Sequence, residues 1–281
     1  MNNTRHIQHA HTALSQKLAT IYDTAEAENI ADWVIESLSG KNRQERSLAQ
    51  DTLTNAQEEQ LERYTVELLQ HRPVQYVLGE SYFYNLKLFV DENVLIPRPE
   101  TEELVHWIIK SEGKTSDKQK IVDIGTGSGC IALSLKMELA HAQVWGLDIS
   151  EEALRVANIN GKALGLAVHF EQLDILKAEE GNDLPAFDII VSNPPYITLP
   201  EKESILPNVL QYEPHQALFV SNNDPLQFYK AIEQFAQRKL AQHGAVFLEL
   251  HRDFAVVTEQ YFNEKGWFTE LRKDMQENDR M

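Results

Sequence analysis

The sequence predicts an α/β fold in which helices cover both faces of a mainly parallel sheet, preceded by a small helical domain. From residue 120 onward, strand patterns alternate with helical patterns, which is typical of parallel strands joined by crossover helices. Through the first 72 residues, apolar side chains recur at helical spacing. A glycine-rich loop joins the first of the later strands to a helix, which favours binding of a nucleotide-like ligand.

The composition is that of an ordinary folded protein. Of the 281 residues, 42% are hydrophobic and 25% are charged, which argues against a disordered or fibrous chain. No apolar run approaches the ~20 residues of a membrane helix, and the N-terminus lacks the apolar core of a secretory signal. Because Cys130 is the single cysteine, no internal disulfide can form, and we expect a cytoplasmic protein. The net charge of −17 counts against a nucleic-acid substrate.

Residues 1–74 are expected to form a helical domain. Two amphipathic helices are followed by a third, which is predicted to begin at Thr54. Thr54 and Gln57 have the spacing of a capping box, in which each side chain bonds the other residue's backbone N–H. The Arg72-Pro73 pair is expected to end this helix. Three histidines are expected to be exposed tail residues and not metal ligands: His6, His9 and His11.

Residues 75–96 change to the alternating pattern of a β-hairpin that turns near Asn85, and we expect this hairpin to link two domains. In the segment from Ile96 to Thr101, two prolines hold the backbone extended. Glu100 and the acids after it favour the start of a helix, because carboxylates stabilise its positive end. Residues 97–281 are therefore expected to form the second domain.

From residue 120, a parallel sheet requires alternating strands and helices. The strands are predicted at 120–125, 143–149, 168–174, 187–193, 245–251 and 268–275. The helices are predicted at 129–140, 151–164 and 225–242.

The glycine-rich loop, Gly125-Thr126-Gly127-Ser128-Gly129, follows a buried strand and precedes a helix. Its glycines let the backbone turn sharply and approach a ligand closely, and the helix offers free N–H groups. Asp148 ends the next strand, where a carboxylate can accept hydrogen bonds from both hydroxyls of a ribose. The Gly-x-Gly-x-Gly spacing fits S-adenosylmethionine better than a dinucleotide, whose pyrophosphate needs a longer loop. A purely structural turn is the alternative interpretation.

Asp174 and Ile175 follow the third strand. The aspartate is a candidate to bond the adenine amino group, and the isoleucine is a candidate to pack on the adenine ring. An ordinary turn at the end of a strand is the alternative.

Asn193-Pro194-Pro195-Tyr196 follows the fourth strand and is the most informative segment. Its prolines lack an N–H and restrict the residues before them, so the loop is stiff and presents carbonyl acceptors. The nitrogen of a carboxamide or aromatic amine is a poor nucleophile, because its lone pair is delocalised. The Asn193 side-chain oxygen and a backbone carbonyl can accept both N–H bonds and aim this nitrogen at a methyl donor, while Tyr196 packs on the planar group. A rigid turn with a buried tyrosine is the alternative.

Several segments together carry a family resemblance. They are Arg72-Pro73-Val74-Gln75-Tyr76 with Gly79, Leu95 to Glu102, Asp123 to Gly129, Asn193 to Tyr196, Tyr212-Glu213-Pro214, and Lys273-Asp274 with Asn278-Asp279-Arg280. With them the chain, from Arg72 almost to its end, resembles the HemK/PrmC family of peptide chain release factor glutamine N5-methyltransferases. The Asn-Pro-Pro-Tyr loop alone is shared with adenine-N6 enzymes, but its combination with the Pro-Arg-Pro-Glu-Thr segment is much more specific.

The resemblance implies a class I S-adenosylmethionine-dependent methyltransferase fold, with a seven-stranded, doubly wound, mostly parallel sheet behind an N-terminal helical bundle for substrate recognition. It implies methylation of the glutamine in the Gly-Gly-Gln motif of class 1 release factors, with S-adenosyl-L-homocysteine as the second product. We expect a monomer that contacts neither nucleic acid directly nor a membrane. The last strand of this fold lies between the fifth and sixth strands and would begin near Arg280.

The resemblance also assigns roles to residues. It implies cofactor binding by Gly125, Thr126, Gly127, Ser128, Gly129, Asp148, Asp174, Ile175 and Asn193. It implies catalysis by Asn193, Pro194 and Tyr196. It implies substrate binding by Asn193, Pro194, Pro195, Tyr196, Arg98, Pro99, Glu100 and Thr101, with Leu95 lining the site and no metal.

Two other functions remain open from the sequence. An adenine-N6 nucleic-acid methyltransferase would use the same loop, but it would need a basic recognition region, and the best basic cluster is small: Lys41, Arg43 and Arg46. A non-catalytic cofactor-binding module would predict a broken Asn-Pro-Pro-Tyr or glycine loop, and both are intact. Glu249 and His251, at the end of the fifth strand, are expected to serve packing or loop hydrogen bonds.

Overall fold

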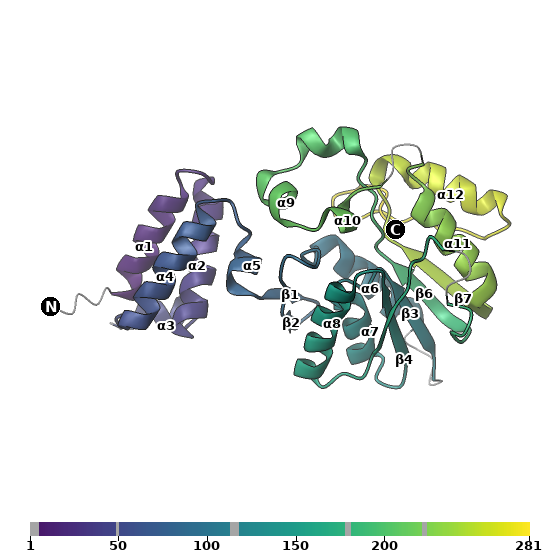
Figure 1. Cartoon of the computed structure of the whole chain (residues 1–281), viewed down its shortest axis with the longest axis horizontal. Coiled ribbons are helices and arrows are strands. Elements are labelled where there is room, and N and C mark those ends of the chain that lie inside the picture. The colour runs from purple at the N-terminus through teal and green to yellow at the C-terminus, as the bar shows by residue number, and fades with distance from the viewer. Residues whose placement is uncertain (1–5, 49–50, 113–117, 178–180, 221–223) are drawn as a thin grey trace. The chain divides into compact units, whose positions relative to one another are not determined.

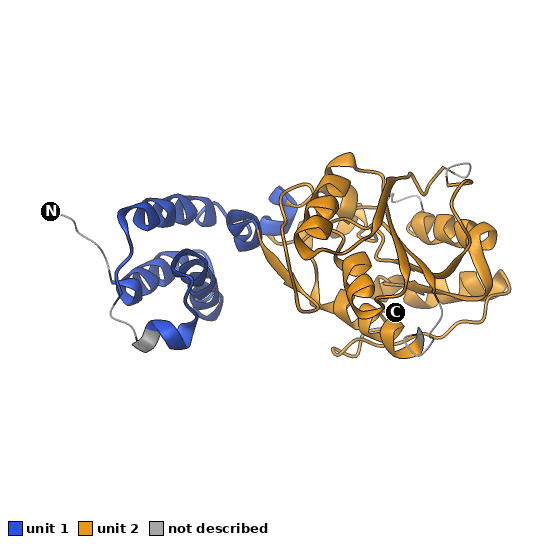
Figure 2. Cartoon of the chain, turned by 90° about the horizontal axis from the view of Figure 1, so that it is seen from below, with its two compact units in different colours: residues 1–79, 207–212 blue, residues 80–206, 213–281 orange. Residues whose placement is uncertain are grey.

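The computed structural model describes residues 6–48, 51–112, 118–177, 181–220 and 224–281. The chain forms two compact units, coloured separately in Figure 2. We call residues 1–79 with 207–212 the helical unit, and residues 80–206 with 213–281 the sheet unit. The domain boundaries expected from the sequence, at 74/75 and 96/97, remain a prediction.

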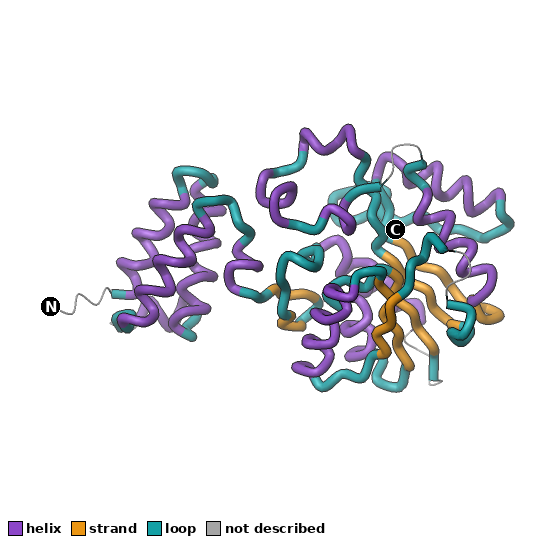
Figure 3. Tube along the Cα trace, viewed as in Figure 1, coloured by secondary structure: helices purple, strands orange, loops and turns teal. Residues whose placement is uncertain are grey.

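The described part of the helical unit consists of helices and their connections (Figure 3). The helices are α1 (Ile7–Leu18), α2 (Thr24–Ser39), α3 (Arg43–Leu48), α4 (Asn55–Leu68), α5 (Val74–Leu78) and α9 (Pro207–Tyr212). One face of each longer helix supplies the core, with Leu14, Val34 and Leu61 among its buried residues. The predicted capping box is confirmed, because Thr54 and Gln57 bond each other's backbone N–H at the start of α4.

Three short helices of this unit were not predicted from the sequence: α3, α5 and α9. Helix α9 is separated from the others by more than a hundred residues along the chain. The Tyr212 hydroxyl nevertheless donates to the Gln70 carbonyl oxygen at 2.9 Å. A contact between residues so far apart in the sequence produces no periodic pattern from which it could be predicted.

The predicted hairpin is confirmed by the antiparallel pair β1 (Ser81–Phe83) and β2 (Leu86–Leu88). Its two turn residues, Tyr84 and Asn85, have positive φ angles of 45° and 65°. Two such residues give the strands a turn whose twist matches their own. Phe83, Leu86 and Leu88 are buried against the sheet unit's core.

The central sheet is parallel and contains five strands over the described residues, in the order β5-β4-β3-β6-β7. The strands are β3 (Lys120–Ile124), β4 (Gln143–Asp148), β5 (His169–Gln172), β6 (Phe187–Ser192) and β7 (Leu240–Leu248). Strand order reverses between β3 and β6, so this is a doubly wound α/β sheet, and the predicted fold class is confirmed.

Successive residues of the strands enter two different cores, because side chains alternate across a sheet. Ile121 and Ile189 face α6 (Pro99–Glu112) and α7 (Cys130–Glu138). Val122 and Ile190 face α11 (Gln227–Lys239). Helix α8 (Glu151–Leu164) lies with α6 and α7, and α12 (Ala255–Glu264) lies on the side of α11 (Figure 1). Burial on both faces explains the nearly continuous apolar strands.

Three details of the predicted sheet are wrong. The described residues form five strands in this sheet and not seven. The segment 268–275 forms no strand and has one isolated bridge, between Lys273 and Asp279. Strand β7 begins at Leu240 instead of residue 245, directly after α11. The predicted helix ran on to residue 242, and Gln242 and His243 break the apolar pattern, so this half of the strand was concealed.

The last residues are held by backbone hydrogen bonds to two other segments of the sheet unit. The Leu250 N–H donates to the Arg280 carbonyl oxygen at 2.7 Å, and the Arg272 N–H donates to the Met281 carbonyl oxygen at 2.7 Å.

The remaining short elements are η1 (Leu199–Ser204), α10 (His215–Leu218) and η2 (Arg252–Phe254). Over the described ranges, no helix has the length and apolar character that crossing a bilayer requires.

We expect Gly146→Ala to destabilise the sheet unit by about 1–3 kcal/mol, the usual cost of overpacking. A Cβ at Gly146 would lie 2.7 Å from the Phe170 ring and 2.8 Å from the Thr126 hydroxyl oxygen. Urea unfolding measures this cost. The matched control is Gly161→Ala, where the added Cβ would lie 3.3 Å from the Leu166 carbonyl oxygen and 3.4 Å from the same ring. Equal stability of the two variants would contradict the prediction.

Candidate functional site

The glycine-rich loop turns sharply at the carboxyl end of β3. Gly125, Gly127 and Gly129 have φ angles of 75°, 55° and 82°, a region that other residues rarely adopt. The N–H groups of Gly125 and Thr126 both donate to the Leu147 carbonyl oxygen, at 2.8 and 2.9 Å. The loop is therefore fixed against the end of β4.

Asp148, the last residue of β4, is held by two backbone donors. The Gly127 N–H donates to its Oδ2 atom and the Ser150 N–H donates to its Oδ1 atom, each at 2.9 Å. Burial raises the pKa of Asp148, although these backbone hydrogen bonds oppose the rise. The carboxylate is thus positioned by the loop it faces, with lone pairs left for a ligand.

Asp123 supports the glycine loop from the protein interior. The Thr126 hydroxyl donates to its Oδ2 atom at 2.7 Å. The aspartate is fully buried, and burial raises its pKa to about 7, against the lowering effect of hydrogen bonds from Thr126 and from the Ala132 backbone. Thr126 therefore points into the protein and stabilises the turn.

The Asn-Pro-Pro-Tyr loop begins where β6 ends. The Ser192 hydroxyl donates to the Ile124 carbonyl oxygen at 2.7 Å, which ties the loop to β3. The Asn193 side-chain NH₂ donates to the Thr101 hydroxyl oxygen at 3.0 Å. The Tyr196 hydroxyl donates to Glu249 Oε1 at 3.1 Å. Burial and the nearby Glu249 charge raise the pKa of Tyr196 above its ordinary range.

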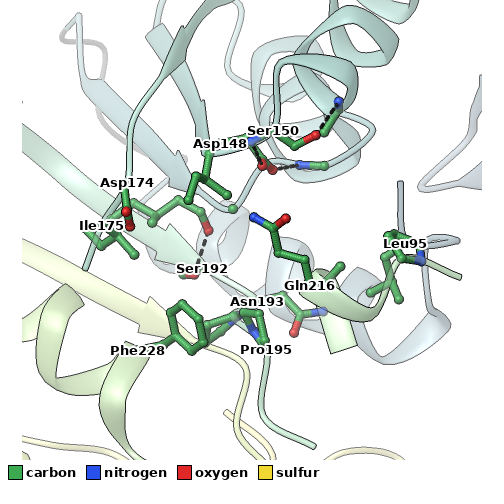
Figure 4. Close-up of a pocket in the computed structure, with 18 of the residues that line it drawn as sticks. Leu95, Asp148, Ser150, Asp174, Ile175, Ser192, Asn193, Pro195, Gln216 and Phe228 are labelled. Atoms are coloured by element: carbon green, nitrogen blue, oxygen red, sulfur yellow. Dashed lines mark hydrogen bonds between the residues drawn. The ribbon is translucent and has the colours of Figure 1, made fainter. Parts of the chain in front are cut away.

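One cavity of the sheet unit brings both loops together (Figure 4). Nine of the residues predicted for the site line it: Leu95, Gly125, Gly127, Asp148, Asp174, Ile175, Asn193, Pro194 and Pro195. Asp148 and Asp174 supply its carboxylates, and much of the remaining wall is apolar. Such a wall with a few placed polar groups is typical of a small-molecule site.

Eight other predicted residues do not line this cavity: Thr126, Ser128, Gly129, Tyr196, Arg98, Pro99, Glu100 and Thr101. Several of them support residues that do. Thr101, at the start of α6, lies behind Asn193. Arg98 forms an ion pair with the buried Glu213 carboxylate at 2.5 Å, and the Ile96 N–H donates to the same carboxylate at 3.2 Å.

The sequence reasoning missed part of the cavity wall. Gln216 on α10 projects between Asp148 and Asn193, and Phe228 on α11 lies beside Pro195 (Figure 4). Leu95, expected from the resemblance, lies on another side of the cavity. Gln216 and Phe228 follow no recognisable motif, so they could be found only from the folded chain.

Among the described residues, Glu201, His251 and Asp253 lie close enough together to suggest a metal site. Both ring nitrogens of His251 are already in hydrogen bonds. Its Nε2 atom lies 2.9 Å from Glu201 Oε1, and its Nδ1 atom accepts from the Asp253 N–H at 3.2 Å. His251 therefore connects η1, through Glu201, with the start of η2, through Asp253.

Two family models match the chain. One, described as a methyltransferase domain, matches residues 115–265. The other, described as the PrmC N-terminal domain, matches residues 9–79.

Curated relatives match over most of the chain. The release factor glutamine methyltransferase of Flavobacterium psychrophilum is 43% identical over 98% of this chain and 97% of its own length. The protein of the same name from Bacteroides thetaiotaomicron is 38% identical over 86% of each chain. A solved structure described as the delta-N METTL16 MTase domain matches 70% of this chain and 86% of its own with a TM-score of 0.51. At 15% identity it supports the fold alone.

We expect Asp123→Asn to remove a pH dependence of stability. A carboxyl whose pKa rises from 3.8 to about 7 on folding binds more protons when folded, so its ionisation destabilises the protein as pH rises between these values. The free energy of unfolding of the variant, relative to wild type, should therefore increase by about 2–3 kcal/mol from pH 5 to pH 8. Urea unfolding at both pH values measures the difference, and an unchanged difference would contradict the prediction.

Proposed function

Since the chain belongs to the release factor glutamine methyltransferase family, we propose that it methylates the side-chain amide nitrogen of a release factor glutamine. The acceptor is the glutamine of the Gly-Gly-Gln motif in class 1 factors, so the enzyme supports translation termination. The observation that carries the proposal is the presence of Asn193 in the same cavity as the glycine loop.

S-adenosylmethionine is the methyl donor, and the cavity fits it. A Cβ built on Gly125 or Gly127 would meet no atom within 4 Å, so the loop leaves open space for a ligand against its backbone. Asp148, Asp174 and Ile175 all line the cavity. Asp148 is proposed to accept the ribose hydroxyls, and Asp174 with Ile175 is proposed to flank the adenine. When bound, this cofactor supplies an electrophilic methyl group on a positively charged sulfur.

Asn193 and Pro194 are proposed to hold the acceptor amide. The Asn193 side chain donates its NH₂ group to Thr101, which leaves its carbonyl oxygen free to accept an N–H of the glutamine. The Pro194 backbone carbonyl is the second proposed acceptor. Tyr196, expected from the sequence to contact the planar amide, lies outside the cavity wall and is proposed to hold the loop through its hydrogen bond to Glu249. Two such bonds orient the nitrogen for attack, so placement and electrostatics carry the catalysis. The amide proton becomes acidic once the nitrogen is methylated, so no strong base is required beforehand.

The wider assignments follow from this proposal. A monomer acting in the cytoplasm, without direct contact to nucleic acid, suits an enzyme whose substrate is a release factor. The N-terminal domain expected at residues 1–74 is proposed to recognise the factor, with the hairpin region 75–96 as its link to the methyltransferase domain. The comparisons do not favour the adenine-N6 alternative.

Labelled S-adenosylmethionine should transfer its methyl group to a class 1 release factor. A Gln→Ala change in the factor's Gly-Gly-Gln motif should abolish the labelling, because the accepting nitrogen is gone. DNA and RNA serve as the competing acceptors. Label on nucleic acid but not on the factor would contradict the proposal.

Asn193→Ala should lower kcat by about 10²–10³-fold, as the loss of one oriented hydrogen-bonding group does in oxyanion holes. Cofactor affinity should change far less, because most of the cavity wall is untouched. Steady-state kinetics and calorimetric titration with S-adenosylmethionine separate the two effects. Equal losses in turnover and cofactor affinity would argue against an amide clamp.

A further inference from the structure

A buried chain of hydrogen bonds lies behind Asn193. The Asn193 NH₂ group donates to the Thr101 hydroxyl oxygen at 3.0 Å, and the Thr101 hydroxyl donates to Glu249 Oε2 at 2.6 Å. The Tyr196 hydroxyl donates to the other oxygen, Oε1, at 3.1 Å. Thr101 is 2% exposed and Glu249 is 1% exposed, so water does not compete for these bonds. One carboxylate thus connects with two residues of the Asn-Pro-Pro-Tyr loop.

The direction of these bonds follows from the carboxylate. While its carboxyl group is ionised, Glu249 only accepts hydrogen bonds, so the hydroxyls of Thr101 and Tyr196 both donate to it. The Thr101 oxygen then has only lone pairs to offer Asn193. An asparagine amide can meet a lone pair only with its NH₂ group, so its carbonyl oxygen must face the other way.

We propose that Glu249 is a positioning residue which, through Thr101, sets the orientation of the Asn193 amide and thereby presents its carbonyl oxygen to the acceptor glutamine. This inference rests on the proposed function. It gives Glu249 a task beyond the loop hydrogen bonding expected from the sequence, and it places Thr101 behind the site instead of in its wall.

The surroundings of Glu249 support this role. Among the described residues, no ion pair within 4 Å includes Glu249, whereas the buried Glu213 nearby pairs directly with Arg98. Burial raises the pKa of Glu249, while its hydroxyl donors and the more distant Arg280 charge lower it and Glu100 adds to the rise. A buried carboxylate without a direct cation is costly unless it is fully hydrogen-bonded. If the carboxylate sets the orientation of the Asn193 amide, an apolar side chain at position 249 could not replace it.

Thr101→Val keeps the shape of the side chain and removes the relay, and Glu249→Gln replaces one acceptor oxygen with a donor. Each should lower kcat for the release factor by about 10- to 100-fold, by analogy with the loss of a partner that orients a metal-binding residue. The KM for the factor and the affinity for S-adenosylmethionine should stay close to wild type. Thr101→Ser, which retains the hydroxyl, should recover most of the lost activity.

Two buried residues outside the relay provide matched controls. Thr258→Val removes a buried hydroxyl that donates to the Phe254 carbonyl oxygen at 2.8 Å. Glu233→Gln alters a buried carboxylate that accepts from the Trp267 ring nitrogen at 2.9 Å. Both should keep the wild-type kcat. A kcat loss in Thr101→Val or Glu249→Gln no larger than in its control would overturn the proposal.

The double variant Thr101→Val with Glu249→Gln tests the connection between the two residues. If Glu249 acts through Thr101, the double variant should lose little more kcat than Thr101→Val alone, whereas independent roles would multiply the two losses. Multiplied losses would overturn the relay. Should Glu249→Gln fail to fold, Thr101→Val, its serine rescue and its control still decide the matter.

Nuclear magnetic resonance separates this inference from the proposed function. The side-chain NH₂ signals of Asn193, assigned with Asn193→Ala, should shift in Thr101→Val and stay in place in Thr258→Val, without any acceptor present. If wild-type enzyme fails to label the release factor, the proposed function fails, yet the shift still reports the bond to Thr101. An unchanged Asn193 signal in Thr101→Val would overturn the relay even in an active enzyme.

Discussion

The parallel register of β3 between β4 and β6 is the constraint on which the site depends. Ile124 pairs with Leu147 on one side and with Ser192 on the other. The residues that follow these three are Gly125, Asp148 and Asn193. They therefore leave the sheet side by side at its carboxyl edge, on either side of the point where strand order reverses. The two loops meet in one cavity because the strands keep this register.

A chain that folds this way must bury polar groups beneath the cavity, and it does so with hydrogen bonds. Asp123 accepts from Thr126 under the glycine loop, and Glu249 accepts from two hydroxyls under the Asn-Pro-Pro-Tyr loop. Burial raises the pKa of both carboxyl groups. Such groups reduce stability unless they are well satisfied. Each of the two buried carboxyl groups accepts hydrogen bonds from a residue of a site loop or of its support, so the groups that are costly to bury are also those that fix the loop geometry.

The sequence predicted the parts of the fold that rest on local patterns. Each of these features is predicted by residues that lie within a few positions of it. They are the Thr54 cap, the hairpin turn at Asn85 and the two loop motifs. The parts it missed depend on contacts distant along the chain. Helix α9 contacts Gln70 through Tyr212, and Gln216 reaches the cavity from a helix too short to show a period. The prediction of seven strands came from the family resemblance, whereas the described residues form a central sheet of five hydrogen-bonded strands.

The two buried glutamates beside the cavity have different structural roles. Glu213 pairs with the Arg98 guanidinium and accepts the Ile96 N–H, so it fixes where a segment of backbone runs. Glu249 accepts from two hydroxyls, and a hydroxyl can turn to donate or accept as its neighbours require. With no direct cation at Glu249 among the described residues, its two hydroxyl donors are what satisfy this buried carboxylate, and the same two hydroxyls take their direction from it.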